Sequence, residues 1–244
     1  MNAAFRELGL DWRYVKLPVR PELFAETVRA LPGSGYRGAN VTIPHKLAAH
    51  ELADVLSPAA GAIGAVNTLT FAEGRILGDN TDAGGLIDAL EATPRGSRAG
   101  VLGAGGAGRA AAWALREAGA DVWVWNRTAD RALALAGELG LRRVERPEAC
   151  DLLVNATSVG LVPVSEEDAL AVLALGGLEV PGTVVDLVYG DEETPLCRWA
   201  RAGGAIVVNG LEVLVRQAAR SLALWTGREA PVAAMRRAAS AAHV

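Results

Sequence analysis

The sequence is poor in the residues that build disulfides, metal centres and membrane spans. It has 2 cysteines, Cys150 and Cys197, far apart and without a C-x-x-C pair, and its 3 histidines show no ligand spacing. These scarcities argue against a disulfide scaffold and a structural metal. No apolar run reaches the roughly 18 residues of a membrane helix, and no charged-then-apolar leader opens the chain. We therefore expect a cytoplasmic protein.

Long runs of one charge are also missing. The net charge is -4 and no long basic run occurs, which argues against nucleic acid and against an electrostatically held membrane surface as partners. A small anionic ligand would need local positive groups. What remains is ordinary globular composition, 51% hydrophobic and 21% charged over 244 residues, enough for one large or two modest domains.

The second half of the chain alternates short apolar strands with helices. We predict strands at Val101, Asp121–Trp125, Leu141–Val144, Leu152–Val154, Thr183–Val188 and Ala205–Val208. This alternation is typical of a doubly wound parallel sheet in an α/β protein. Residues 93–98 (TPRGSR) form the clearest linker.

The first part of the chain mixes helices and strands. We predict helices at Asn2–Leu8, at Pro21–Leu31, after Lys46 up to about Val55, and at Ala83–Leu90. A loop should contain Ser57 and Pro58. Strands are expected at Trp12–Leu17, Asn40–Ile43, Gly64–Phe71 and Arg75–Leu77, the last two joined by a turn at Glu73-Gly74. Two C-terminal helices should follow, Leu211–Trp225 and another from Pro231 to about Ala242.

A glycine-rich turn follows the strand at Val101. Gly103, Gly105 and Gly108 fill a G-x-G-x-x-G pattern, followed by a helix of good formers and a second apolar strand. Such glycines permit a tight turn, the approach of a pyrophosphate and close helix packing. The amides of the helix N-terminus then face the phosphates. The alternative is a purely structural βαβ unit.

The end of that second strand indicates which dinucleotide is bound. An NAD site would place Asp or Glu there, whereas this chain has Asn126, Arg127 and Thr128. A guanidinium can bind a 2′-phosphate that a carboxylate would repel, so NADP is favoured. Thr128 as a helix N-cap with a solvated Arg127 is a compatible alternative.

Polar side chains gather near the ends of several predicted strands, where open α/β sheets bind ligands. Thr42 and Lys46 follow one strand, and Asp79-Asn80-Thr81-Asp82 lies beside the predicted domain border. Gln217 falls off the apolar stripe of its helix, so it is either solvated or faces a cleft. Lys46 could likewise be a solvated lysine, and Thr42 or Asn67 ordinary turn and strand residues.

Taken in order, these segments resemble the shikimate dehydrogenase family over nearly the whole chain. The matching segments are residues 40–46 (NVTIPHK), 64–68 (GAVNT), 79–82 (DNTD), 103–109 (GAGGAGR), 126–128 (NRT), 155–158 (NATS), 186–189 (DLVY), 217–219 (QAA) and 225–227 (WTG). The resemblance implies NADP-dependent, reversible reduction of 3-dehydroshikimate to shikimate, a step of chorismate and aromatic amino acid biosynthesis. Quinate or aminoshikimate specificity within the same family stays open.

The resemblance also implies residue roles and domain limits. Lys46 and Asp82 match the catalytic pair, and Thr42, Asn67, Tyr189 and Gln217 match substrate-binding positions. The cofactor-binding positions are Gly103, Ala104, Gly105, Gly106, Ala107, Gly108, Asn126, Arg127, Thr128, Asn155, Thr157 and Gly210. A substrate domain would comprise residues 1–82 plus 211–244, an NADP-binding Rossmann domain residues 83–210, and the protein would be a monomer or homodimer.

The same chemistry follows from the residue types. Oxidising a secondary alcohol requires a base, and reducing a ketone requires an acid near the carbonyl. Lys46 can serve either way, while Asp82 orients the lysine and binds a substrate hydroxyl. His45 is assigned a structural role.

One family feature has no counterpart in this sequence. The family carries an N-terminal strand and a Ser-x-Ser-Pro loop whose serines bind the substrate carboxylate, and Asn2-Ala3-Ala4-Phe5 matches the helix after that loop. Two expectations stay open: a start further upstream, or an NADP-binding protein with little turnover. In the second case we also expect unpaired strand edges.

Overall fold

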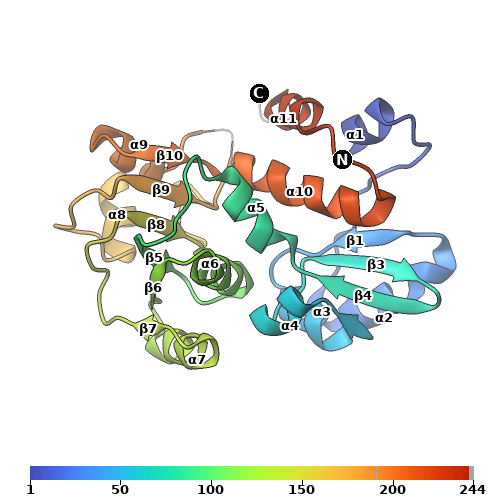
Figure 1. The fold of residues 1–244 in the computed structure, drawn as a ribbon, viewed down its shortest axis with the longest axis horizontal. Coiled ribbons are helices and arrows are strands. Elements are labelled where there is room, and N and C mark those ends of the chain that lie inside the picture. Colours follow the sequence, from blue (N-terminus) through green and yellow to red (C-terminus); the bar gives the residue numbers. More distant parts are fainter. Residues whose placement is uncertain (191, 242–244) are drawn as a thin grey trace.

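The protein contains two β-sheets with a pair of helices between them (Figure 1). The structure is a computed structural model that describes residues 1–190 and 192–241. A four-stranded sheet has the order β1-β3-β4-β2, and a six-stranded sheet has the order β10-β9-β8-β5-β6-β7. Over the described residues, no helix has the length and apolarity needed to span a bilayer.

The smaller sheet is built from the N-terminal part of the chain. Its strands are β1 (Gly38–Asn40), β2 (Val55–Leu56), β3 (Thr68–Ala72) and β4 (Arg75–Asp79), and its helices are η1 (Pro21–Leu23), α2 (Phe24–Ala30), η2 (Pro32–Ser34), α3 (Lys46–Leu52) and α4 (Pro58–Ile63). β3 pairs antiparallel with β1 and β4, while β2 joins β4 in parallel. The expected turn at Glu73-Gly74 is confirmed. Phe24 and Val28 of α2 pack with Leu69 and Ile76 of the sheet into one buried core.

The larger sheet is parallel throughout. Its strands are β5 (Arg98–Leu102), β6 (Asp121–Trp125), β7 (Arg142–Arg143), β8 (Leu152–Asn155), β9 (Thr183–Asp186) and β10 (Ile206–Val208), and its helices are α6 (Gly106–Glu117), α7 (Ala129–Leu139), α8 (Glu166–Val172) and α9 (Pro195–Ala202). The predicted doubly wound sheet is confirmed. The chain runs outward from β5 to β7 and then resumes at β8, on the other side of β5, so the strand order reverses there. Ligands of open α/β sheets bind at such a reversal.

Two helices lie between the two sheets and connect them (Figure 1). α5 (Thr81–Ala89) leads out of the smaller sheet, and α10 (Gly210–Thr226) returns to pack along it. A Cβ added at Gly85 would lie 2.6 Å from the backbone nitrogen of Gln217, so a glycine is required where the helices touch. Arg220 of α10 also holds Asp88 of α5 through two hydrogen bonds of 2.6 and 2.8 Å. The terminal helices α1 (Asn2–Glu7) and α11 (Val232–Ala241) pack beside α10.

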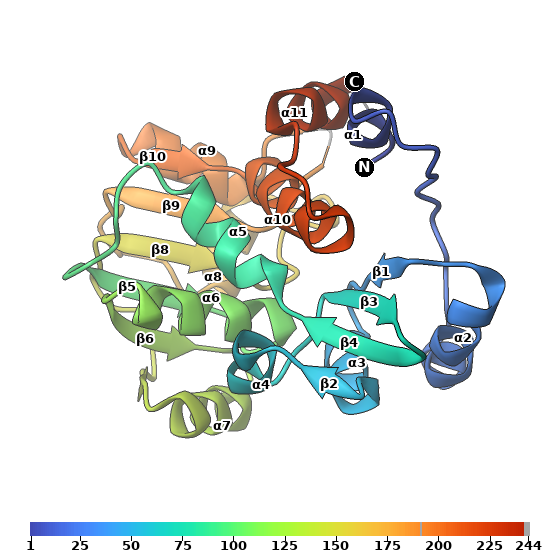
Figure 2. The ribbon, with the colours of Figure 1, turned by 45° about the vertical axis from the view of Figure 1, so that its right-hand side comes forward.

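Several sequence predictions in the first part of the chain were wrong. The helix predicted to about Val55 ends at Leu52, Val55–Leu56 forms strand β2, and the strand predicted from Gly64 begins at Thr68. Among the described residues, Trp12–Leu17 forms no strand, and Figure 2 shows this segment descending as an extended chain from α1 to α2. A strand requires a neighbour, and here the Asn2 side chain bonds both the N–H and the C=O of Tyr14 instead. β1 ends at Asn40, before Ile43, and pairs with β3 alone.

The predicted loop at Ser57 and Pro58 was also wrong, because these two residues begin helix α4. Ser57 is the N-cap, accepting the backbone N–H of Ala60 at 3.2 Å, and Pro58 occupies the first turn. The last helix is confirmed to Ala241, and its predicted end near residue 242 lies outside the described residues.

Candidate active site

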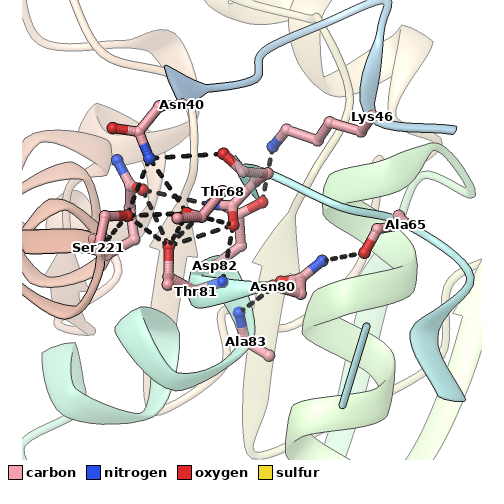
Figure 3. A network of polar contacts seen from close by, with 11 residues as sticks. Asn40, Lys46, Ala65, Thr68, Asn80, Thr81, Asp82, Ala83 and Ser221 are labelled. Atoms are coloured by element: carbon pink, nitrogen blue, oxygen red, sulfur yellow. Dashed lines mark hydrogen bonds and ion pairs between the residues drawn. The ribbon is translucent and has the colours of Figure 1, made fainter. Parts of the chain in front are cut away.

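An ion pair between Lys46 and Asp82 forms the centre of the candidate site (Figure 3). Lys46 begins α3 and Asp82 lies in the first turn of α5, so two different elements present the pair. Lys46 Nζ lies 2.7 Å from Asp82 Oδ2, with side-chain exposures of 12% and 19%. The pair is thus shielded from bulk water, while part of each group still reaches the surface.

Asn67 holds the second oxygen of the same carboxylate. Its Nδ2 donates to Asp82 Oδ1 at 2.8 Å. The orientation of the Asn67 amide follows from the backbone N–H of Thr81, which donates to Asn67 Oδ1 at 2.7 Å. A backbone N–H can only donate, so the amide oxygen must face Thr81 and the NH₂ must face Asp82. Both carboxylate oxygens of Asp82 are therefore held in place.

Three hydroxyls lie together (Figure 3), and two of them contact the Asn67 side chain. Thr68 of β3, Thr81 of α5 and Ser221 of α10 lie within 2.8 to 3.1 Å of one another through their hydroxyl oxygens, and all three are buried. Asn40 donates to Ser221 at 2.8 Å and to Thr68 at 3.1 Å. We call Asn40, Thr68, Thr81 and Ser221 the hydroxyl cluster. It joins β1 and β3 to α5 and α10, the two helices that carry the predicted site residues Asp82 and Gln217.

Gln217, one turn before Ser221 on α10, reaches the same site. Its Oε1 accepts from Asn67 Nδ2 at 3.2 Å and from Thr81 Oγ1 at 3.3 Å. The structure thus brings Lys46, Asp82, Asn67 and Gln217 together, and the solvated alternatives for Lys46 and Gln217 do not hold. Thr42 is exposed between β1 and α3, and its side chain makes no hydrogen bond within the described part of the chain.

Tyr189 lies at the border of this group. It is 41% exposed and lines a pocket with Asn209 and Leu211. Burial first, and then the nearby Tyr189, raise the pKa of the Tyr14 phenol above its usual value. Tyr14 in turn donates to Asn40 Oδ1 at 3.1 Å, so the two tyrosines adjoin the outer end of the hydroxyl cluster.

The glycine-rich turn lies directly against Lys46. A Cβ added at Gly106 would be 3.0 Å from the Cβ of Lys46. Two further glycines shape the turn: Gly103 has a φ of 107°, and a Cβ on Gly108 would be only 2.1 Å from the Gly103 carbonyl oxygen. Gly105, by contrast, faces open space, with nothing within 4 Å of an added Cβ. The first turn of α6 therefore has free room in front of its amides, next to the catalytic candidate.

Asn126, Arg127 and Thr128 follow β6 at the same edge of the sheet. Asn126 accepts the backbone N–H of Ala104 at 3.3 Å and donates to the Thr128 carbonyl at 2.9 Å, so it ties this loop to the glycine turn. Arg127 is exposed and has no ion-pair partner among residues 1–190 and 192–241. Thr128 occupies the N-cap position of α7, although its side chain makes no capping bond. An anion placed here would meet an uncompensated guanidinium.

Asn155 and Thr157 belong to a buried network after β8. Asn155 donates to Asp186 Oδ1 at 2.8 Å and accepts from the Thr157 hydroxyl at 2.7 Å. Burial raises the pKa of Asp186 above its usual range, despite hydrogen bonds from Thr194, Val188 and Asn155 that oppose the shift. Gly210 begins α10 so close to β9 that an added Cβ would be 2.6 Å from the Leu187 carbonyl oxygen. These residues shape loops at the sheet's carboxyl edge.

Sequence reasoning missed the residues behind the site. It assigned no role to Asn40, Thr68, Thr81 or Ser221. A signal existed for Ser221, which is the one polar residue among the buried residues of an amphipathic helix. It also assigned no role to Arg109, whose Nε donates at 2.6 Å to the carbonyl of Ile63, the last residue of α4, and which pairs with Glu138. His45 has structural contacts as expected, because it stacks on Phe24 at 4.6 Å and contacts the Val19 carbonyl at 3.0 Å.

Comparison with known proteins gives a consistent result. The family described as shikimate dehydrogenase substrate binding domain matches residues 1–69, and the shikimate 5'-dehydrogenase C-terminal domain matches residues 210–239. A shikimate dehydrogenase (NADP(+)) of Thermus thermophilus is 47% identical over 92% of this chain and 85% of its own length. That of Methanopyrus kandleri is 44% identical over 97% of this chain and 88% of its own.

The fold agrees with these sequence matches. The structure of a shikimate 5-dehydrogenase from Thermus thermophilus, in complex with NADP(H) and shikimate, superposes with a TM-score of 0.86 at 42% identity. The match covers 100% of this chain and 92% of that one. With relatives above 40% identity spanning nearly its whole length, the chain belongs to the shikimate dehydrogenase family.

Proposed function

We propose that this protein catalyses the NADP-dependent, reversible reduction of 3-dehydroshikimate to shikimate. The observation that carries the proposal is the position of Lys46, between Asp82 at 2.7 Å and the backbone of Gly106 in the glycine turn. A proton-transferring group and a dinucleotide turn thus adjoin one another. A reaction that couples proton transfer with hydride transfer requires this proximity.

The residues present fit an NADP molecule. Gly105 leaves open space before the amides of α6, which suits a pyrophosphate at a helix N-terminus. Arg127 and Thr128 lie at the next strand end and would hold the 2′-phosphate, as Asn126 positions their loop. Asn155, Thr157 and Gly210 would support the remaining loops around the cofactor. When bound, the nicotinamide supplies or accepts the hydride.

Lys46 is assigned the proton transfer. In the ion pair the ammonium carries the proton that a carbonyl oxygen needs on reduction, and the neutral amine would accept it back on oxidation. Asp82 orients Lys46 and accepts a hydrogen bond from a substrate hydroxyl. Because Asn67 occupies Asp82 Oδ1 and Lys46 occupies Oδ2, the carboxylate cannot rotate away from the reacting centre.

Substrate recognition is assigned to polar groups around this pair. Asn67, Gln217 and Thr42 would bind hydroxyl groups of the ring, and Tyr189 would line the cleft. Both Gln217 and Asn67 present amides fixed from behind by the hydroxyl cluster, so their orientation is set before substrate arrives.

The domain division is part of the proposal. Residues 1–82 with 211–244 would bind substrate, and residues 83–210 would bind NADP. Two features support it: the two sheets are separate in hydrogen bonding, and α5 and α10 are the elements that pass between them.

A steady-state assay tests this function. The protein should produce NADPH from NADP and shikimate, and Lys46→Ala should abolish the rate. Lys16, the only other lysine in the chain, is exposed, so Lys16→Ala is the matched control and should retain full activity. Turnover of quinate or an aminoshikimate in preference to shikimate would overturn the proposed substrate, and NADPH binding without turnover of any of them would overturn the enzymatic proposal.

A further inference from the structure

Ser221 is buried within the hydroxyl cluster, one helical turn after Gln217. Its side chain has 0% exposure, while its neighbours on α10, such as Leu222 and Val215, are apolar and buried. Serine is a weaker helix former than the alanine or leucine that this stripe otherwise contains. A buried hydroxyl must be hydrogen-bonded to be tolerated, so its contacts indicate what it does.

Ser221 has a polar contact on each side. Asn40 Nδ2 donates to its Oγ at 2.8 Å, and the Thr68 and Thr81 hydroxyls lie at 2.8 and 3.0 Å (Figure 3). The Gln217 carbonyl lies at 3.1 Å. The hydroxyl therefore connects Asn40 of β1 with residues of β3, α5 and α10.

Groups that can only donate fix part of this hydrogen-bond network. The Asn40 amide donates one proton to Ser221 and one to Thr68, and Thr68 can donate to Asn67 Oδ1 at 3.1 Å. The Ser221 hydroxyl has one proton and three oxygens within reach, the Thr68 hydroxyl, the Thr81 hydroxyl and the Gln217 carbonyl. When Ser221 donates to Thr81, the Thr81 hydroxyl is left to donate to Gln217 Oε1 at 3.3 Å, and in this arrangement Ser221 acts on Gln217.

The consequence concerns the side-chain amide of Gln217. With its oxygen held by Thr81 and Asn67, its NH₂ is directed away from the cluster, where no residue of the described chain bonds it. We propose that Ser221 is a positioning residue that, through Thr81, fixes the Gln217 amide with its NH₂ presented to a hydroxyl of the substrate. This inference rests on the proposed function. It adds a residue that touches neither Lys46 nor Asp82.

The kinetic signature of this role is specific. Ser221→Ala removes the hydrogen bonds of Ser221 in the cluster, among them the contact with Thr81 that holds the Gln217 amide, so KM for shikimate should rise about threefold to about tenfold. The value of kcat should stay within about twofold, because the Lys46–Asp82 pair is untouched, and KM for NADP should not change. A merely structural loss would lower kcat and raise both KM values together, or would lower the melting temperature.

A double-mutant cycle tests the route through Gln217. In a Gln217→Ala background, Ser221→Ala should produce no further rise in KM, because the group it positions is absent. Ser221→Cys keeps the side-chain size with a weaker hydrogen bond, so an intermediate KM is expected, and it serves if Ser221→Ala fails to fold. Thr226→Val is the matched control, since Thr226 makes the same kind of bond to the carbonyl four residues earlier on α10, at 2.7 Å, outside the cluster.

Two results would overturn the inference. One is an unchanged KM for shikimate in Ser221→Ala at full activity, and the other is an additive effect of the two substitutions. Failure of the proposed function is distinguishable, because the unsubstituted protein would then not oxidise shikimate at all.

Discussion

Replacing Asp82 by asparagine tests how the central pair works. Asparagine retains the shape of the aspartate side chain. However, both oxygens of the carboxylate accept hydrogen bonds, whereas one end of the amide is an NH₂ group that donates. If its oxygen faces Asn67 Nδ2, as the 2.8 Å contact requires, its NH₂ points at the Lys46 ammonium, which lies 2.7 Å from the present carboxylate. If the amide flips, two NH₂ groups face each other. Either way, one donor meets another donor in a site where both partners are mostly buried.

The size of the effect follows from these contacts. Losing a charge-assisted hydrogen bond costs about 1.5 to 3 kcal/mol, and an unsatisfied buried donor about 1 to 3 kcal/mol. The two costs overlap, so we take about 2 to 4 kcal/mol in the transition state, and kcat/KM should fall about 30-fold to about 1,000-fold. The assay is the steady-state rate of NADPH formation from shikimate.

The control lies on the same helix. Asp88→Asn, six positions later in the sequence, removes an ion pair to Arg220 whose side chains are 36% and 47% exposed. Exposed pairs contribute little, so this variant should change kcat/KM by less than about twofold. If Asp82→Asn retained a rate within about threefold of the unsubstituted protein, while melting at the same temperature, the reasoning on both carboxylate contacts would be refuted.

The remaining predictions concern the cofactor turn and an acid-sensitive ion pair. Arg127→Ala should weaken NADPH binding about tenfold to about a hundredfold and leave NADH binding unchanged, as measured by fluorescence titration; equal loss for both would contradict a 2′-phosphate role. Gly105→Ala should keep the melting temperature, because an added Cβ meets only open space, but it should lose NADPH affinity, because that space is where the pyrophosphate would lie. Gly108→Ala should lower both the melting temperature and the affinity, because its Cβ would be 2.1 Å from the Gly103 carbonyl oxygen. Arg236 first, and then Arg216, hold the pKa of Glu212 below its usual 4.5. A group whose pKa is lowered in the folded state contributes stability above its unfolded pKa, and that stability is lost as the pH falls through the folded pKa. Glu212→Gln should therefore melt earlier than the parent at about pH 7, and the gap in melting temperature should narrow as the pH falls below the usual 4.5. A gap in melting temperature that persists in acid would exclude that linkage.

Much of the fold could be predicted because its signals are local. Strands β5, β6 and β8 are buried on both faces, and their sequences are short apolar runs. The turn after β5 requires glycine at Gly103, which has a positive φ, and at Gly108, where a Cβ would clash with the Gly103 carbonyl. Helix α4 also had a local signal, since Ser57-Pro58 is a capping pair that was interpreted as a loop. The predicted strand at Trp12–Leu17 was wrong for another reason. Its residues favour a strand, but pairing depends on a neighbour that local sequence does not specify.

The candidate site was predicted only in part. Lys46, Asp82, Asn67 and Gln217 were found through the family resemblance, and the structure brings them together. Their catalytic and binding roles stay predictions. The hydroxyl cluster could not be foreseen, because Thr68 and Ser221 are 153 positions apart, and only the fold brings their oxygens to 2.8 Å.

The path of the chain has a consequence for biosynthesis. Asn40 bonds Ser221 across 181 positions, so the first sheet meets its partner helix only after nearly the entire protein has left the ribosome. Residues 98–208 contribute all six strands of the larger sheet, so most of its core is synthesised before α10, whereas the early region must wait, incompletely packed, for that helix. Assembly of the reaction centre should thus be among the last events of maturation, and ribosome-bound chains stalled before α10 should lack any affinity for shikimate.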